Sequence, residues 1–419
     1  MTTFDRPPPP LGTDISGKQP YPSGLLARIV GINFPFPTAV AIAEQGLLLV
    51  GGMAVALDTG DSFPGISTGA TGKLINTKPF TVLTPGVVVY GKPQHGDPCF
   101  MACTDGTTIL RGHQDIGGDM EGIVWDPVYG ANGLCALSFA GGAFFVVYQP
   151  GSSQSTTASC AVSFDGENFN EIGNIYSGLP SLSVHDQLVP GSVAFNGNGY
   201  ATAGAFFTDP NYPYIIGLDD QNMAWASSGD GLGWSADCSR SETQDPGTEP
   251  YGLGLGAGGT TTALAYTSIA GGAGRFVAVA TTRTVFQTIF PVPGTGGEVF
   301  EQYVFPTAAA AISGDGSSWT VNKLPGAFEA FYSEPVGGPQ DRTDSTAASV
   351  VFVRTGGNAG YFVISATGLS QQGASNSYAS WCWKGDGSSW QMVKQSNDAN
   401  FGTVSAIARN LASTKIVYA

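Results

Sequence analysis

The sequence has few charged side chains, and the positive ones are the scarcer kind. Charged residues make up 12% of the 419 residues, with 17 Lys and Arg against 32 Asp and Glu, and the formal net charge is −15. A surface of this sign is repelled by phosphate backbones and by anionic lipid. We therefore expect no nucleic acid partner and no membrane surface as a partner.

Long apolar runs are also absent. No stretch reaches the roughly 18 apolar residues that a helix needs to cross a bilayer, so we expect no membrane insertion. Residues 1–6, followed by four prolines at positions 7–10, have neither the positive segment nor the apolar segment of a secretory signal. We expect no cleaved leader.

Metal-ligating residues are few and have no pattern. The six cysteines fall mostly in apolar runs and include no C-x-x-C pair, and the three histidines have no partner at i+2 or i+4. The glycine-rich segment 252–256 leads into a Thr-rich run with no helix signal, so it does not predict a phosphate loop. We expect buried thiols, no metal site and no cofactor.

Glycine, by contrast, is abundant, and one glycine-containing turn recurs. The 60 glycines are about twice the usual share of roughly 7%. The sequence Gly-Asp-Gly-Ser-Ser-Trp occurs at 314–319 and again at 385–390, and looser copies lie earlier in the chain. The aspartates of the repeated turn are Asp58, Asp105, Asp165, Asp230, Asp315 and Asp386, and the large aromatic residues after them are Phe63, Phe169, Trp234, Trp319 and Trp390.

Each copy lies between two short apolar runs, which predicts the tight turn of a β-hairpin. The Asp can accept hydrogen bonds from the backbone N–H groups of its own turn, Gly supplies a positive φ, and the aromatic residue packs at the start of the next strand. We therefore expect these turns to build structure and to perform no catalysis.

A unit of four strands recurs from residue 25 onward, with the Asp-Gly turn between its third and fourth strands. We count six such units and a final pair of strands after residue 403. The sequence predicts an all-β fold: a single β-propeller over residues 25–419, preceded by an extended Pro- and Gly-rich arm over residues 1–24. We expect seven four-stranded blades, closed by pairing a strand at 25–30 with one at 414–419, and six blades as the alternative.

The turns resemble the Asp-box (BNR-like) repeats of sialidase-type β-propellers. The copy at residues 58–63 fits the usual spacing, and the others resemble a form one residue shorter that is associated with bacteriophage virion propellers and bacterial surface propellers. The resemblance covers nearly the whole chain after residue 24. A sialidase of this family uses three Arg to hold a carboxylate, a Tyr nucleophile with a Glu partner and an Asp acid/base, and the nine Arg of this chain do not occur in the expected setting.

The long insertions should lie on one face of such a propeller. The connections after the second and fourth strands carry segments 173–190, 208–222, 238–262, 282–306 and 324–346, whereas the other face has short turns only. Aromatic residues among small polar residues suit glycan or protein contact, and they also suit packing within their own loops. The candidate ligand-binding residues are Tyr212, Tyr214, Tyr251, Phe290, Tyr303, Phe328, Phe331 and Tyr332.

These features lead us to expect a non-enzymatic bacteriophage virion structural protein. It would be attached to the tail or capsid through residues 1–24, beside other virion proteins, and would present its loop face to a host glycan or protein receptor. One alternative is a carbohydrate-active enzyme, either sialidase-like or a glycosidase with two carboxylates. The other is a secreted bacterial adhesin or scaffold.

Overall fold

A computed structural model gives the structure of this chain, and the ranges it describes contain strands, turns and no helix. The described residues are 40–42, 47–50, 53–56, 73–74, 87–103, 106–114, 123–149, 157–179, 187–207, 221–238, 268–291, 298–327, 329–331, 341–356, 359–372, 375–396, 407–409 and 416–418. The predicted arm at 1–24 and the predicted closing strand at 25–30 lie outside them. No helix in these ranges is long and apolar enough to cross a membrane.

The first three sheets each contain four antiparallel strands in chain order. The first sheet is formed by β1 (Val40–Ile42), β2 (Leu47–Val50), β3 (Met53–Ala56) and β4 (Lys73–Leu74). The second is formed by β5 (Val87–Gly91), β6 (Cys99–Cys103), β7 (Thr108–Gln114) and β8 (Ile123–Gly130). The third is formed by β9 (Leu134–Ala140), β10 (Ala143–Tyr148), β11 (Ser159–Ser163) and β12 (Asn170–Asn174).

The next three sheets keep this plan with additions. The fourth has β13 (Gln187–Val189) and β14 (Val193–Phe195) on one side of β15 (Tyr200–Phe207), followed by β16 (Gln221–Ser228) and β17 (Ser235–Cys238). The fifth is formed by β18 (Ile269–Gly272), β19 (Arg275–Pro291), β20 (Glu298–Ser313) and β21 (Thr320–Lys323). The sixth is formed by β22 (Glu329–Phe331), β23 (Asp341–Gly356), β24 (Ala359–Gln372), β25 (Ser375–Gly385) and β26 (Trp390–Ser396).

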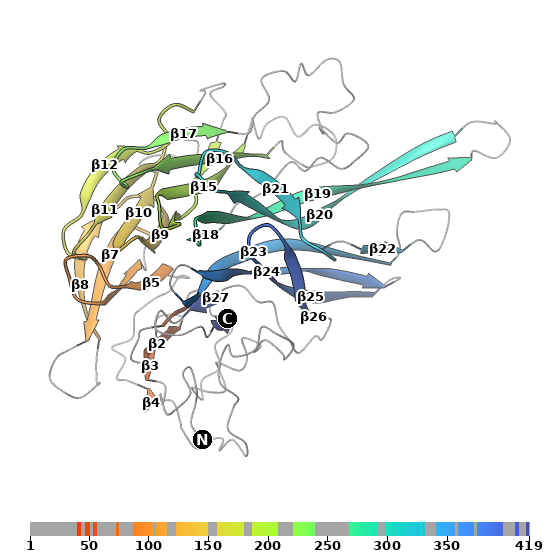
Figure 1. The fold of residues 1–419 in the computed structure, drawn as a ribbon. Helices are drawn as coiled ribbons and strands as arrows, with labels where there is room; N and C mark the ends of the chain where they lie inside the picture. Colours follow the sequence, from red (N-terminus) through yellow and green to blue (C-terminus); the bar gives the residue numbers. More distant parts are fainter. Residues whose placement is uncertain are drawn as a thin grey trace.

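The last sheet has only two described strands, β27 (Ile407–Arg409) and β28 (Ile416–Tyr418). The prediction of an all-β fold made of four-stranded antiparallel units is therefore confirmed. One strand of each sheet contacts one strand of the next sheet, in the order β1, β5, β9, β14, β18, β23 and β27, and β27 also contacts β1. The fold is propeller-like, with sheets that follow one another in sequence lying side by side (Figure 1).

The hydrophobic core lies between successive sheets. One cluster joins the third and fourth sheets around Phe145 and Tyr176, and another joins the fifth and sixth around Trp381 and Trp383. Alanines 308–311 of β20 are fully buried. Their small side chains let the faces of two sheets approach closely, as in sheet-on-sheet packing.

One segment expected to be a loop is instead a long hairpin. β19 and β20 pair without interruption from Phe276↔Ser313 to Pro291↔Glu298, so residues 282–291 and 298–306 extend the fifth sheet. Figure 1 shows this hairpin projecting well beyond the other sheets. Phe290 and Tyr303 lie in its two strands, where the backbone register pairs them with Val299 and Phe286.

Candidate functional site

Four of the recurring turns are described, and their aspartates make the same hydrogen bonds. Asp315 Oδ1 accepts the N–H groups of Ser317 at 2.8 Å and Ser318 at 2.9 Å. The corresponding pairs of N–H groups bond to Oδ1 of Asp165, Asp230 and Asp386. One carboxylate oxygen thus satisfies two backbone donors that the tight turn would leave unpaired.

A serine two residues before the Asp completes the turn, and the sequence analysis missed it. Ser313 Oγ donates to Asp315 Oδ1 at 3.0 Å and accepts the N–H of Gly316 at 2.8 Å. Ser163 and Ser228 make the same two bonds in their own turns. The signal was present in the sequence as Ser-x-Asp-Gly in these three copies.

The last turn has Lys384 in place of the serine, and a residue from the preceding sheet supports it. Arg275 Nη1 donates to the backbone oxygen of Asp386 at 3.1 Å and also to Ser388 Oγ. The arginine therefore ties the fifth sheet to the sixth on the face that carries the turns.

The glycine after the Asp is required by both conformation and space. Gly316 has φ +80°, and a Cβ there would lie 2.9 Å from Ala201 Cβ. Gly166, Gly231 and Gly387 also have positive φ. After the turn, the indole N–H of Trp319 donates to the Gly316 oxygen at 3.0 Å, which fixes the ring against its own turn.

We expect Asp315→Ala to lower the free energy of unfolding by about 1 kcal/mol at pH 7. Two turn N–H groups lose their acceptor, but the turn is exposed, so water replaces part of the loss. The N–H groups of Ser318 and Ser317 hold the pKa of Asp315 well below its usual range. The stabilisation is therefore complete above about pH 5 and is lost as the pH falls below about 4.

Urea unfolding of both proteins at pH 7 and pH 3 checks this, with Asp315→Asn as the matched variant. Asparagine keeps an acceptor oxygen but cannot ionise, so its deficit at pH 7 should be smaller than that of alanine. A difference between wild type and Asp315→Ala that is the same at both pH values would contradict the role of the ionised carboxylate.

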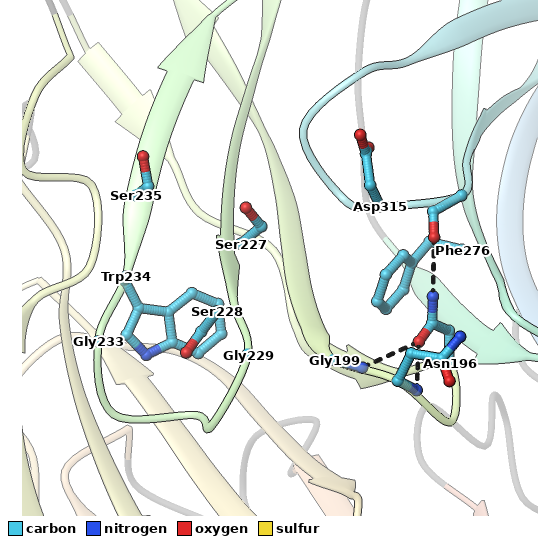
Figure 2. A pocket seen from close by; sticks show the side chains of 12 residues that line it. Asn196, Gly199, Ser227, Ser228, Gly229, Gly233, Trp234, Ser235, Phe276 and Asp315 are labelled. Atoms are coloured by element: carbon cyan, nitrogen blue, oxygen red, sulfur yellow. Dashed lines mark hydrogen bonds between the residues drawn. The ribbon is translucent and has the colours of Figure 1, made fainter.

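A cavity of about 660 Å³ opens among these turns, between the fourth and fifth sheets. Its described lining comes from the β14–β15 turn, the β16–β17 turn, β19 and the β20–β21 turn. The lining residues are Asn196, Asn198, Gly199, Ser227, Ser228, Gly229, Gly233, Trp234, Ser235, Phe276, Gly314 and Asp315. Figure 2 shows Trp234 and Ser235 on one side, with Phe276 and Asp315 on the other.

The rim of the cavity is held in place by Asn196, which is 4% exposed. Its Oδ1 accepts the N–H groups of Asn198 at 2.8 Å and Gly199 at 3.1 Å, and its Nδ2 donates to the Gly314 oxygen of the next sheet at 3.1 Å. Two of these bonds are drawn in Figure 2 as dashed lines from Asn196 to Gly199 and to the opposite turn. Because the oxygen accepts two hydrogen bonds and the nitrogen donates one, Asn196 shapes the cavity and has little capacity left for a ligand.

Trp234 is fixed in the same manner. Its indole N–H donates to the Gly231 oxygen at 3.0 Å, and its ring packs edge-to-face with Phe145, with 6.4 Å between the ring centroids and an interplanar angle of 85°. The indole nitrogen is therefore occupied, and what remains for a ligand is the partly exposed ring surface. The side chains of Asn198, Ser227 and Ser235 make no hydrogen bond within the described part of the chain, so their polar groups remain open.

Of the eight candidate residues from the sequence, three have a described place in the fold. Tyr212, Tyr214, Tyr251, Phe328 and Tyr332 lie outside the described residues. Phe290, Tyr303 and Phe331 lie in strands β19, β20 and β22. Of the turn residues, Asp315 and Trp234 line the cavity, so the face expected to be bare carries the described hollow.

No protein-family model matches the sequence, and no curated protein does. Among solved structures, a proposed glycoside hydrolase from Bacteroides ovatus ATCC 8483 is similar at 12% identity, covering 67% of this chain and 76% of its own, with a TM-score of 0.32. A glycosyl hydrolase from Bacteroides ovatus has 12% identity, coverage of 70% and 85%, and a TM-score of 0.31. A proposed glycoside hydrolase from Parabacteroides distasonis ATCC 8503 has 11% identity, coverage of 87% and 86%, and a TM-score of 0.28.

The predictions of a non-enzymatic bacteriophage virion protein and of no enzymatic activity are corrected by these comparisons, since each structure named is described as a glycoside hydrolase. The virion interpretation depended on residues 1–24, which are not described, and on a turn motif that builds structure in propellers of many functions. The virion location and partners stay predictions that nothing here tests. At 11–12% identity, no residue role transfers from these proteins to this chain.

Proposed function

We propose that this protein is a carbohydrate-active β-propeller and that it holds a sugar in the cavity beside Trp234. The observation that carries the proposal is a fixed indole ring facing polar, mostly uncharged side chains across a hollow of about 660 Å³. This volume lies within the range of small-ligand sites, about 300–1,000 Å³. A pyranose has an apolar C–H face that suits an aromatic ring and a rim of hydroxyls that needs hydrogen-bond partners.

The polar groups of the lining fit that rim. Asn198 offers an amide with two donors and an acceptor, and Ser227 and Ser235 offer hydroxyls that both donate and accept. Ser227 and Ser235 lie on the two strands of the β16–β17 hairpin that carries Trp234, and Asn198 belongs to the β14–β15 turn, which also lines the cavity. A sugar stacked on the indole would therefore meet open hydrogen-bonding groups around its edge.

Hydrolysis of the bound glycan is the enzymatic form of this proposal. A glycosidase of the common type needs two carboxyl groups about 5–10 Å apart. Among the described lining residues, Asp315 supplies one carboxylate, so its partner would have to come from outside them. Reducing-sugar release from a panel of polysaccharides tests this step, and loss of release in Asp315→Asn with retained binding would support it.

We expect Gly229→Phe to abolish glycan binding without unfolding the protein. A Cβ at Gly229 meets no atom within 4 Å and its φ lies outside the left-handed range, so a large side chain would extend into open space at the cavity. Trp234→Ala should also weaken binding about tenfold, because it removes the aromatic ring on which the sugar would stack; a nucleic acid base stacked on such a ring contributes about 1–3 kcal/mol. Retardation in gels containing a neutral polysaccharide measures both effects.

Gly130→Phe is the matched control, since a Cβ at Gly130 also meets open space and the residue lies in β8, away from the cavity. It should bind like the wild type. Undiminished retardation of Gly229→Phe, with an unchanged melting temperature, would place the glycan elsewhere and refute the proposed site.

We also propose that the sheets form a closed seven-bladed propeller with Asp-box turns of the sialidase type. The count of seven is supported by six sheets of four or more strands and by the pair β27–β28. The closure is supported by the contacts of β27 with both β23 and β1. The common bonding of Asp165, Asp230, Asp315 and Asp386 supports the assignment of the turns. The two strands that would complete the last blade would come from residues 25–36.

A further inference from the structure

We propose that this cavity selects uncharged glycans and rejects anionic ones, such as sialic acids and uronic acids, and that Asp315 is the specificity-determining residue. The inference rests on the proposed function. Of the described residues that line the cavity, Asp315 is the one with a charge, and no Lys, Arg or His accompanies it. A sugar carboxylate would therefore meet a like charge and would find no cationic partner among these described lining residues.

The charge of Asp315 is not compensated by the arginine that lies closest along the chain to this wall. Arg275 directly precedes Phe276, but its guanidinium donates to Asp386 and Ser388 of the sixth sheet's turn. It is not part of the cavity lining. Within its own turn, Asp315 receives only neutral donors, from Ser313, Ser317 and Ser318.

The same neutral donors keep Asp315 ionised in acid. The N–H groups of Ser318 and Ser317 hold its pKa well below the usual range, so the negative charge persists to below about pH 4. Sialic and uronic acids are ionised over the same range. Repulsion between the two carboxylates therefore operates at every pH at which such a glycan is itself charged, and the net charge of −15 adds to it at a distance.

The rest of the lining fits an uncharged ring. Trp234 offers an aromatic surface, and Asn198, Ser227 and Ser235 offer neutral donors and acceptors. Two unit charges about 4 Å apart in a partly hydrated site repel enough to change a dissociation constant fivefold or more. The cavity can thus discriminate by charge without any contact dedicated to the excluded ligand.

The test compares retardation of the full chain in gels that contain a neutral polysaccharide, such as a xylan or a β-glucan, with gels that contain polysialic acid or polygalacturonate. The wild type should bind the neutral polymers at least about fivefold more tightly than the acidic ones. In Asp315→Asn, this ratio of neutral to acidic affinity should fall to about twofold or less. Raising the ionic strength from about 20 mM to 300 mM should also narrow it, because salt screens the repulsion.

Asp386→Asn is the matched control. Its turn has the same sequence, Gly-Asp-Gly-Ser-Ser-Trp, and its substitution changes the net charge equally, but Asp386 does not line the cavity. It should leave the ratio unchanged. Melting temperatures of both variants check the fold, and asparagine retains the oxygen that accepts the turn N–H groups.

Equal retention of acidic and neutral polymers by the wild type would overturn the inference and leave the proposed function standing. The inference would also be overturned if Asp315→Asn and Asp386→Asn changed the ratio of neutral to acidic affinity equally. Retention of no glycan by the wild type would overturn the proposed function and this inference together.

Discussion

Trp383→Ala is expected to lower the free energy of unfolding by about 3–5 kcal/mol, which is the usual cost of truncating a fully buried aromatic residue. Trp383 is 0% exposed and lies in the cluster between the fifth and sixth sheets, together with Trp381 and Phe362. Its indole N–H donates to the Pro325 oxygen at 2.8 Å. The substitution therefore creates a large cavity and also leaves a carbonyl group without its donor.

Urea unfolding measures this loss, and Trp383→Phe separates its two parts. Phenylalanine keeps most of the apolar volume but removes the bond to Pro325, so its deficit should be about 1–2 kcal/mol. If both substitutions lower the free energy of unfolding by the same amount, the packing of Trp383 between these two sheets does not stabilise the protein. A deficit below about 1 kcal/mol for Trp383→Ala would contradict the burial itself.

Removal of residues 412–419 is expected to leave a protein that unfolds at a lower temperature and aggregates. This truncation deletes β28, which is the described partner of β27. Strand β27 contacts both β23 of the sixth sheet and β1 of the first. Without β28, its backbone groups are left as an open sheet edge, which favours pairing with other chains.

Melting curves and light scattering of the truncated chain measure the effect, with deletion of residues 1–20 as the control. Those residues belong to the arm predicted to precede the propeller, so their loss should leave melting unchanged. A C-terminal truncation that melts like the full chain would exclude closure through the last sheet, and with it the seventh blade.

The turns and the order of strands were predictable because they depend on neighbours in sequence. The positive φ of Gly316 and the two N–H groups that bond to Asp315 all lie within residues 315–318. The short apolar runs on either side are typical of paired strands. Ser313 was missed although it is equally local, because serine occurs in many contexts and only its repetition marks it.

The cavity and the hairpin arm were not predictable in the same way. Trp234 and Asp315 come together because the fourth and fifth sheets pack side by side, and no pattern in the sequence marks that contact between residues far apart in the chain. The sequence predicts a long connection at 282–306, but β19 and β20 stay in register as far as the pair Pro291↔Glu298. Pairing between the two strand backbones therefore determined the structure here more than the local residue types did.

The six cysteines give this protein a set of internal reporters for local opening. They form no disulfides and are spread over the sheets at Cys99 and Cys103 in β6, Cys135 in β9, Cys160 in β11, Cys238 in β17 and Cys382 in β25. Burial raises the pKa of Cys135 to about 11 and also raises that of Cys99 and Cys160, so few of these groups are present as the reactive thiolate. A thiol reagent can therefore modify the buried sites mainly when their own sheet opens. The rates at the four buried cysteines would then rank the second, third and sixth sheets by the free energy of their separate fluctuations.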